Sequence, residues 1–201
     1  MTAGARASPA RGGAHKVRII GGLWKRTPLT VVDARGLRPT PDRVRETLFN
    51  WLGTAVQGAR CLDLFAGTGA LGLEAASRGA ASVWLVETDR KAREAIADAL
   101  RRLDARQVRL LAEPATEALV RAQREGLVFD LVFLDPPFGQ DWLARVLPAL
   151  ATVLAPQARV YVESDQALDD TTLALLGPDF RVARADRAGQ VFYHLLTRSP
   201  A

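Results

Sequence analysis

The amino-acid sequence predicts an α/β protein: a doubly wound, mostly parallel sheet of seven strands whose last strand runs antiparallel. Three observations support this fold class. From residue 60 onward, short apolar runs alternate with segments of helical periodicity, which is typical of parallel sheets covered by helices. A glycine-rich turn, Gly67 to Gly72, follows the first run and opens a helix. The last two runs, 180–184 and 191–197, lie too close for a parallel crossover, so they must form an antiparallel hairpin.

The amino-terminal part is predicted to be an appendage in two pieces. Residues 1–14 are rich in Ala, Gly, Ser and Pro and contain nothing to bury, so we expect a disordered basic tail. Residues 15–36 are expected to form a small β-hairpin, with strands at 16–20 and 29–32 around a Gly21-Gly22 turn. The remaining residues, 37–201, make the main domain.

The first helix of the main domain is predicted from Thr40-Pro41-Asp42, with Thr40 as the N-cap and Pro41 at the first helical position. Its expected buried stripe is Val44, Leu48, Trp51 and Leu52. The other strands are expected at 61–65, 82–87, 108–112, 129–134 and 158–163, and the other helices at 70–78, 89–103, 115–124, 142–154 and 168–176.

Composition excludes several classes of function. The chain has 201 residues, of which 48% are hydrophobic, so one domain of ordinary size can bury a core. A single cysteine, Cys61, and two distant histidines, His15 and His194, argue against a metal site and against a Ser-His-Asp triad. No apolar run has membrane-spanning length and the start lacks a secretory signal. We therefore expect a cytoplasmic protein, without a membrane or a metal, and by default a monomer.

Charge is distributed unevenly along the chain, whose net charge is +5. Residues 1–50 hold ten Lys or Arg against three Asp or Glu, whereas residues 51–201 hold seventeen against nineteen. This asymmetry indicates a polyanion that contacts the amino-terminal part. Basic side chains interleaved with an indole suit phosphate contact and base stacking, and the hairpin carries Arg18, Trp24, Lys25 and Arg26. The alternatives are a tail that only aids solubility, and a Trp24 that packs on the main domain.

The glycine turn predicts a nucleoside-like cofactor. Gly67 to Gly72 matches G-x-G-x-x-G, and Glu87 follows Gly67 by twenty residues at the end of the next strand, where a carboxylate can accept from ribose hydroxyls. A dinucleotide would place its pyrophosphate on the helix N-terminus, where Asp63 would face it badly. That carboxylate suits a cationic ligand, such as the amino group or sulfonium of S-adenosylmethionine. The remaining alternative is a tight turn without a ligand.

The stretch FDLVFLDPPF, residues 129–138, reads as a strand buried on both faces that ends at Asp135, because Pro136 and Pro137 cannot continue a central ladder. The ligand edge of an open α/β sheet lies at the carboxyl ends of its strands. There the Asp135 carboxylate and the Pro136 carbonyl can accept hydrogen bonds from an amine, and Phe138 can stack on a base. Taken alone, an Asp-Pro-Pro sequence is often just a strand-ending turn.

The glycine turn and the Asp-Pro-Pro-Phe turn together resemble the class I S-adenosylmethionine-dependent methyltransferases that act on exocyclic amines, which have a Rossmann-like sheet. RIIGG at 18–22, LRPTPDRVRETLFNWL at 37–52, DLFAGTGALGLEAASRGA at 63–80 and YVES at 161–164 extend the resemblance from about residue 16 to residue 196. These stretches resemble the bacterial 16S rRNA (guanine(966)-N2)-methyltransferase family. The resemblance implies that the partner is 16S rRNA in the small ribosomal subunit, methylated at N2 of one guanine.

The resemblance also implies roles for residues of this chain. Asp135, Pro136, Pro137 and Phe138 match the catalytic motif. The cofactor set is Asp63, Phe65, Ala66, Gly67, Thr68, Gly69, Glu87 and Thr88, with Thr40 and Arg43 in the segment that covers the methionine end. Glu113 and Pro114 stand where Asn or Asp followed by Ala commonly holds adenine, so backbone groups or Glu113 must serve there. The expected RNA contacts are Arg18, Trp24, Lys25, Arg26 and Arg38.

Other functions remain as alternatives at this point. An adenine-N6 methyltransferase, or another amino-methyltransferase acting on DNA or RNA, shares the Asp-Pro-Pro-Phe turn. An NAD-dependent oxidoreductase shares the glycine pattern, but no second half-domain and no Tyr-Lys or His arrangement accompanies it. A non-catalytic RNA-binding module would have no use for the intact turn and the paired acids.

Overall fold

A computed structural model describes residues 17–32, 40–176 and 180–198. Its main sheet has seven strands in the order β5-β4-β3-β6-β7-β9-β8. These strands are β3 (Arg60–Asp63), β4 (Ser82–Val86), β5 (Val108–Leu111), β6 (Phe129–Leu134), β7 (Leu154–Ser164), β8 (Phe180–Ala188) and β9 (Val191–Arg198). Neighbours from β5 to β7 pair in parallel, and β9 pairs antiparallel with both β7 and β8. The predicted fold class is confirmed.

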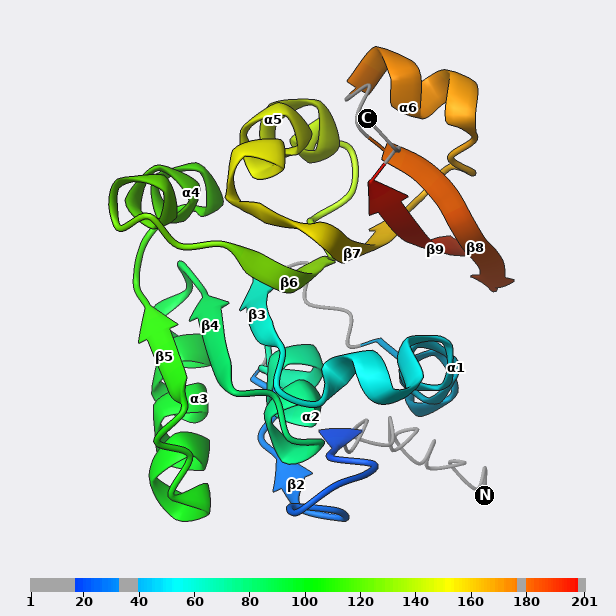
Figure 1. Cartoon of the computed structure of the whole chain (residues 1–201). Helices are drawn as coiled ribbons and strands as arrows, with labels where there is room; N and C mark the ends of the chain where they lie inside the picture. The colour runs from blue at the N-terminus through cyan, green and yellow to red at the C-terminus, as the bar shows by residue number, and fades with distance from the viewer. Residues whose placement is uncertain (1–16, 33–39, 177–179, 199–201) are drawn as a thin grey trace, which may run out of the picture.

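Within the described ranges, six helices cover the two faces of this sheet (Figure 1). They are α1 (Asp42–Leu52), α2 (Ala70–Ser77), α3 (Arg90–Leu103), α4 (Ala115–Arg124), α5 (Trp142–Leu150) and α6 (Asp170–Leu176). One apolar core lies between the sheet and α1 to α3, and a second lies between the sheet and α4 to α6. No helix in the described ranges is long and apolar enough to cross a membrane.

The central strand β6 belongs to both cores, as its apolar run predicted. Leu131 and Phe133 point into the core beneath α1 to α3, while Val132 and Leu134 point into the core beneath α4 to α6. All four are at most 2% exposed. Because side chains alternate along a strand, only a nearly continuous apolar run satisfies both faces. Asp135 directly follows this rigid strand.

The start of α1 differs from the prediction. Its N-cap is Pro41, no side chain caps the helix, and the Thr40 hydroxyl is directed elsewhere. Thr40 Oγ1 lies 2.7 Å from Glu163 Oε1 and 3.2 Å from Asp135 Oδ2, at the ends of two neighbouring strands. The prediction of a Thr40 N-cap was wrong because local propensity could not anticipate two carboxyl groups brought from distant strands.

The buried stripe of α1 is also wider than predicted. Val44, Leu48 and Leu52 are buried as expected, and Phe49 and Arg45 join them. Trp51 is only partly buried, because its ring stacks on Tyr193 of β9 at a centroid distance of 5.4 Å. The buried guanidinium of Arg45 is tied to Asp42 at 2.6 Å.

The amino-terminal hairpin is shorter than predicted. Its strands are β1 (Val17–Arg18) and β2 (Pro28–Leu29), which pair antiparallel. Pairing stops because the chain turns onto α2, where the fully buried Glu74 accepts from the N–H groups of Ile20 at 2.6 Å and Gly21 at 2.8 Å. These bonds satisfy a carboxylate that would otherwise be costly to bury. The predicted tail, residues 1–14, lies outside the described residues.

Several boundaries near the carboxyl end shifted. The helix expected over 142–154 ends at Leu150, followed by a short 3-10 turn, Ala151–Val153. β7 then begins at Leu154 and pairs with β6 through a register shift, so it starts four residues before the predicted strand. Pro148 sits inside α5. Among the central strands, β6 ends at Leu134 as predicted, β7 ends one residue later than predicted, and β3 ends at Asp63 rather than at the predicted residue 65.

Candidate functional site

Four carboxyl groups meet at one edge of the sheet. Asp63 ends β3, Glu87 follows β4, Asp135 follows β6, and Glu163 lies near the end of β7. β3 pairs with β4 on one side and with β6 on the other, and β6 pairs with β7, all in parallel. Parallel strands end at the same edge, so the topology gathers these acids although a hundred residues separate the first from the last.

Asp63 is buried beneath the glycine turn. Its Oδ2 accepts from the Gly72 N–H at 3.1 Å, and its Oδ1 is buried without a hydrogen-bond partner. Burial disfavours the charged form and raises the pKa of Asp63 to about 7. Gly72 is required for this approach, because a Cβ there would lie 2.2 Å from Leu85 Cδ2. Asp63 therefore offers an unused acceptor to a cationic donor.

Glu87 holds the glycine turn from the neighbouring strand. Its Oε2 accepts from the Gly67 N–H at 2.7 Å, and its Oε1 accepts from the Asp89 N–H at 2.7 Å. The α2 helix begins after Gly69, whose φ of 77° lies in the left-handed region that favours glycine. Each carboxylate oxygen of Glu87 keeps a lone pair for a further donor, such as a ribose hydroxyl.

The other residues predicted around the cofactor surround this turn. The Ala66 N–H donates to Val86 O at 2.9 Å, which ties the turn to β4. Thr68 is 8% exposed, whereas Thr88 is exposed. Phe65 is partly buried and meets Trp142 edge-on at a centroid distance of 5.2 Å. The two aromatic rings close the side of the turn nearest α5.

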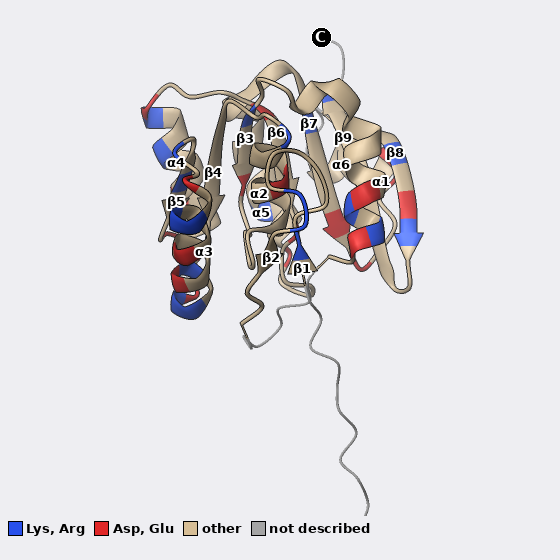
Figure 2. Ribbon diagram, turned by 90° about the horizontal axis from the view of Figure 1, so that it is seen from below, with Lys and Arg blue, Asp and Glu red and all other residues tan. Residues whose placement is uncertain are grey.

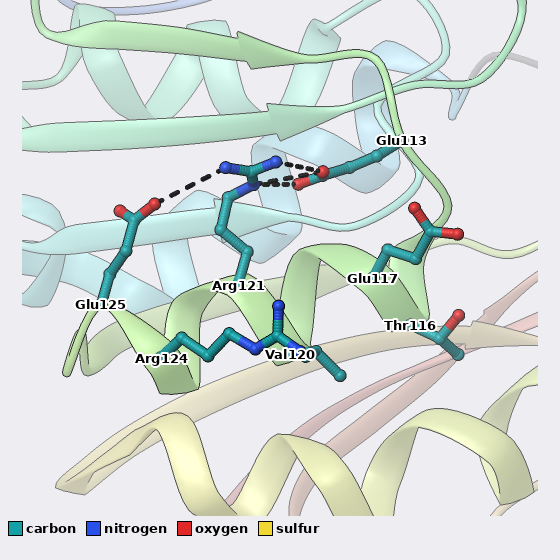
Figure 3. A pocket seen from close by; sticks show the side chains of 7 residues that line it. All are labelled: Glu113, Thr116, Glu117, Val120, Arg121, Arg124 and Glu125. Carbon is teal, nitrogen blue, oxygen red and sulfur yellow. Dashed lines mark hydrogen bonds and ion pairs between the residues drawn. The ribbon is translucent and has the colours of Figure 1, made fainter.

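Glu113 is already engaged in an ion pair. Arg121 of α4 donates to both Glu113 oxygens, from Nε at 2.8 Å and from Nη2 at 2.9 Å, and lies between Glu113 and Glu125 (Figure 3). The pair lines an open hollow of about 510 Å³ along the outer side of α4. Both oxygens of Glu113 are thus engaged by Arg121.

The Asp-Pro-Pro-Phe turn presents polar groups toward an opening. Asp135 is partly exposed, Pro136 is buried, Pro137 is exposed, and the Phe138 side chain is 43% exposed. Burial, together with the nearby Glu163 and Asp63, raises the pKa of Asp135 well above its usual range. A large exposed ring beside a carboxylate is unusual for a purely structural turn.

Beside Phe138 lies a hollow of about 290 Å³, lined also by Asp165, Arg187, Gln190, Val191 and Phe192. The last four belong to β8, β9 and their connecting turn. The Arg187 guanidinium stacks over the Phe192 ring at 4.9 Å from its centroid. The hollow has aromatic and polar walls, which suit a flat, polar ligand.

Glu163 is a residue at this edge that the sequence analysis did not select. It is 4% exposed, and its Oε1 accepts from Tyr161 Oη at 2.8 Å. Burial raises its pKa. The available signal was its position near the end of the strand beside the Asp-Pro-Pro-Phe strand, within the YVES stretch.

The residues predicted to contact RNA divide into four groups. Lys25 and Arg26 are exposed on the hairpin, where basic residues appear in blue (Figure 2). Arg18 pairs with Asp42 at 3.2 Å, two residues beyond Thr40. Trp24 is partly buried against the core, which favours the packing alternative for this ring. Arg38 lies outside the described residues. Arg43, which was predicted near the methionine end of the cofactor rather than at the RNA, is exposed on α1.

The described part of the chain contains no cluster of three or more His, Cys, Asp or Glu able to hold a metal ion. A doubly wound sheet with one antiparallel strand, a glycine turn after its first strand and an Asp-Pro-Pro-Phe turn after its fourth define a class I methyltransferase. Residues 17–197 match the family described as conserved hypothetical protein 95, and the chain belongs to this family.

Relatives with names or structures agree with this assignment. The chain is 42% identical over 192 residues to "Ribosomal RNA small subunit methyltransferase D" of Escherichia coli K12, covering 94% of each chain. It is 40% identical over 155 residues to the Haemophilus influenzae protein of the same name, covering 75% of this chain and 80% of that one. The structure of a putative methyltransferase, yhhF, from E. coli superimposes with a TM-score of 0.79 at 41% identity. The superposition covers 92% of this chain and 99% of that one.

Proposed function

We propose that the protein transfers a methyl group from S-adenosylmethionine to the exocyclic N2 of one guanine in 16S rRNA of the small ribosomal subunit. The observation that carries the proposal is the Asp135 carboxylate, which directly follows β6, the neighbour of the strand that leads into the glycine turn. It precedes Phe138 in the same turn, and Phe138 lines a hollow. The names of the relatives supply the RNA class, and the family resemblance supplies the guanine, number 966 in the family's name. A monomer acting in the cytoplasm is part of the same proposal.

The residues of the glycine turn fit S-adenosylmethionine. The buried Asp63 Oδ1, which lacks a partner, is placed to accept from the cationic amino group of the methionine end. Glu87 has lone pairs left for the ribose hydroxyls. When bound, S-adenosylmethionine supplies an electrophilic methyl group on a sulfonium. A dinucleotide pyrophosphate would instead bring negative charge toward Asp63, so the same residues disfavour NAD.

The Asp-Pro-Pro-Phe turn would orient the amine. A guanine N2 is a poor nucleophile because its lone pair is delocalised into the ring. Hydrogen bonds from its two N–H groups to the Asp135 carboxylate and the Pro136 carbonyl would hold the nitrogen in line with the methyl group. Phe138, 43% exposed beside the hollow, offers a face for the base. Alignment and electrostatics then supply most of the rate.

The amino-terminal hairpin would contact the RNA backbone. Lys25 and Arg26 are exposed, and the hairpin is anchored to α2 through Glu74, so its charges are presented from a fixed base. A target base within a stem must leave its stack to reach the hollow. Phosphate contacts of this kind position the protein on RNA without reading the sequence.

An experiment with radiolabelled S-adenosylmethionine tests the acceptor class. The full chain is incubated separately with small subunits that lack the mark, with their naked 16S rRNA and with DNA. Label in the RNA of the small subunits supports the proposal, and comparison with naked RNA identifies the preferred form. Label in DNA alone supports the adenine-N6 alternative, and no label in any acceptor contradicts the proposal.

A further inference from the structure

We propose that Thr40 and Glu163 form a one-proton relay behind Asp135. The proton resides on Asp135 while the acceptor site is empty, and it passes through the Thr40 hydroxyl to Glu163 when the substrate amine arrives. Thr40 and Glu163 are then positioning residues, because they act on the substrate through Asp135. The inference rests on the proposed amine methylation, which gives Asp135 its task.

The number of hydrogens available between Asp135, Thr40 and Glu163 indicates that the two carboxyl groups share a proton. A threonine hydroxyl carries one hydrogen, yet Thr40 Oγ1 lies 2.7 Å from Glu163 Oε1 and 3.2 Å from Asp135 Oδ2. If both carboxyls were ionised, the hydroxyl would donate to one and turn its lone pairs toward the other. A proton on Asp135 turns the longer contact into a hydrogen bond, in which Asp135 donates to Thr40 Oγ1.

The hydrogen bonds also indicate which carboxyl is ionised in the empty site. Glu163 Oε1 accepts from Tyr161 Oη at 2.8 Å and has the shorter contact with Thr40, so two donors stabilise its charge. Asp135 has the longer contact with Thr40, and the charge of Glu163 opposes its ionisation. The pKa of Asp135 is raised well above its usual range by burial and by this neighbour.

The titratable groups around the pair are one acid and two phenols. The charge of Asp63, at the end of β3, acts on Asp135. Tyr161 on β7 donates to Glu163, and the ring of Tyr193 on β9 lies 6.5 Å from the ring of Tyr161. Among the ion pairs of the described ranges, none joins a Lys or Arg to either carboxyl. Two neighbouring carboxyls without a cation cannot readily both ionise, so they retain one proton between them.

Movement of that proton would prepare Asp135 for the amine. Asp135 gives its proton to Thr40 Oγ1 while the Thr40 hydroxyl proton passes to Glu163 Oε1, so one proton leaves Asp135 and one arrives at Glu163. The ionised Asp135 then accepts an amine N–H in place of its own proton. The net charge of the pair is unchanged, which avoids adding charge to a buried site.

The first test is a carboxyl NMR titration of the full chain without ligand. In Glu163→Gln the neighbouring charge is gone, so the Asp135 titration is expected to move to lower pH by about one unit or more. Tyr161→Phe removes a hydrogen-bond donor from Glu163 and should also move the Asp135 titration to lower pH. This second variant keeps the test available if Glu163→Gln does not fold. Glu117→Gln, on the exposed side of α4, is the matched control. An Asp135 titration that stays in place in both variants overturns the proposal.

The second test is a double-mutant cycle on methyl transfer. Thr40→Val should lower kcat by about 10- to 100-fold, while Thr40→Ser retains the hydroxyl and the rate. In the Glu163→Gln background Asp135 is already ionised, so the same Thr40→Val change should lower kcat by a smaller factor. Equal losses in both backgrounds, or a loss confined to cofactor affinity, overturn the relay. A wild-type protein that does not methylate ribosomal RNA would refute the proposed substrate, and the titration would still decide the proton sharing.

Discussion

The Gly72 N–H donates to Asp63 Oδ2 at 3.1 Å, while the other oxygen of that carboxylate is buried without a partner. One oxygen of Asp63 therefore has a hydrogen-bond donor, which comes from α2, the helix that follows the glycine turn, and the other oxygen has none. The arrangement is costly in the free protein, because burial raises the pKa of Asp63 to about 7. It becomes favourable when a cationic donor occupies the open oxygen. If this turn is the cofactor site, as we propose, the buried carboxylate lowers the stability of the free protein and raises its affinity for the cofactor.

Substituting Asp63 by Asn is expected to change the pH dependence of stability. The folded pKa of about 7 exceeds the unfolded value, so Asp63 makes the free energy of unfolding fall as pH rises from about 4 to 7. Asn does not ionise, so the Asp63→Asn variant does not lose this part of its free energy of unfolding as pH rises. Relative to wild type it should gain on the order of a few kcal/mol between pH 4 and pH 8, measured by urea unfolding. Its cofactor affinity should fall, and a stability difference that does not change with pH would refute the assignment.

Substituting Glu87 by Ala is expected to weaken cofactor binding. The change removes the carboxylate that accepts from Gly67 and that would accept from the ribose. Loss of charged hydrogen bonds of this kind predicts an affinity about 10- to 100-fold lower by calorimetry. Glu94→Ala on the exposed face of α3 is the control. Equal affinities for the two variants would exclude Glu87 from the ribose site.

Substituting Asp135 by Ala is expected to abolish methyl transfer while cofactor binding survives. Asp135 follows β6 and would contact the amine, whereas most of the predicted cofactor groups lie at the ends of β3, β4 and β5. The rate should fall at least about 100-fold, as when a transition-state hydrogen-bond partner is removed. Loss of cofactor binding in a normally folded variant would instead move Asp135 into the cofactor site.

Neutralising Lys25 and Arg26 together is expected to weaken RNA binding and flatten its salt dependence. Each phosphate contact removed should reduce the slope of log K against log salt by about one. Point substitutions suit this test because Ile19 is fully buried and the Ile20 and Gly21 N–H groups bind Glu74, so truncation would disturb the fold. Arg124→Ala on α4, which covers the opposite face, is the control. An unchanged slope would remove the hairpin from the interface.

Much of this fold could be read from periodicity. The boundaries of α4 and β6 match the prediction residue for residue, because β6 is a continuous apolar run ended by two prolines and α4 has a clear stripe. The glycine turn and the antiparallel last pair were also readable, since each depends on local spacing. The short length of the amino-terminal hairpin could not be predicted, because β1 ends where the chain binds Glu74 on a helix distant in sequence.

The candidate site was only partly readable for the same reason. Asp63, Glu87 and Asp135 stand at strand ends with recognisable neighbours in the sequence. Thr40 was predicted as a helix cap and, from the resemblance, as part of the segment that covers the methionine end, and Glu163 carried no motif of its own. The contact between Thr40 and Glu163 spans 123 residues. The pairing of β6 with β7 brings Asp135 to the same hydroxyl. Buried polar contacts of this kind follow from topology, which a single sequence shows incompletely.

The identity of the methylated nucleoside tests the central claim most directly. Small subunits lacking the mark are treated with S-adenosylmethionine and either wild-type protein or Asp135→Ala, and their RNA is digested to nucleosides for mass spectrometry. We expect N2-methylguanosine with the wild-type protein and none with Asp135→Ala. N6-methyladenosine, or N2-methylguanosine formed equally well by Asp135→Ala, would contradict it.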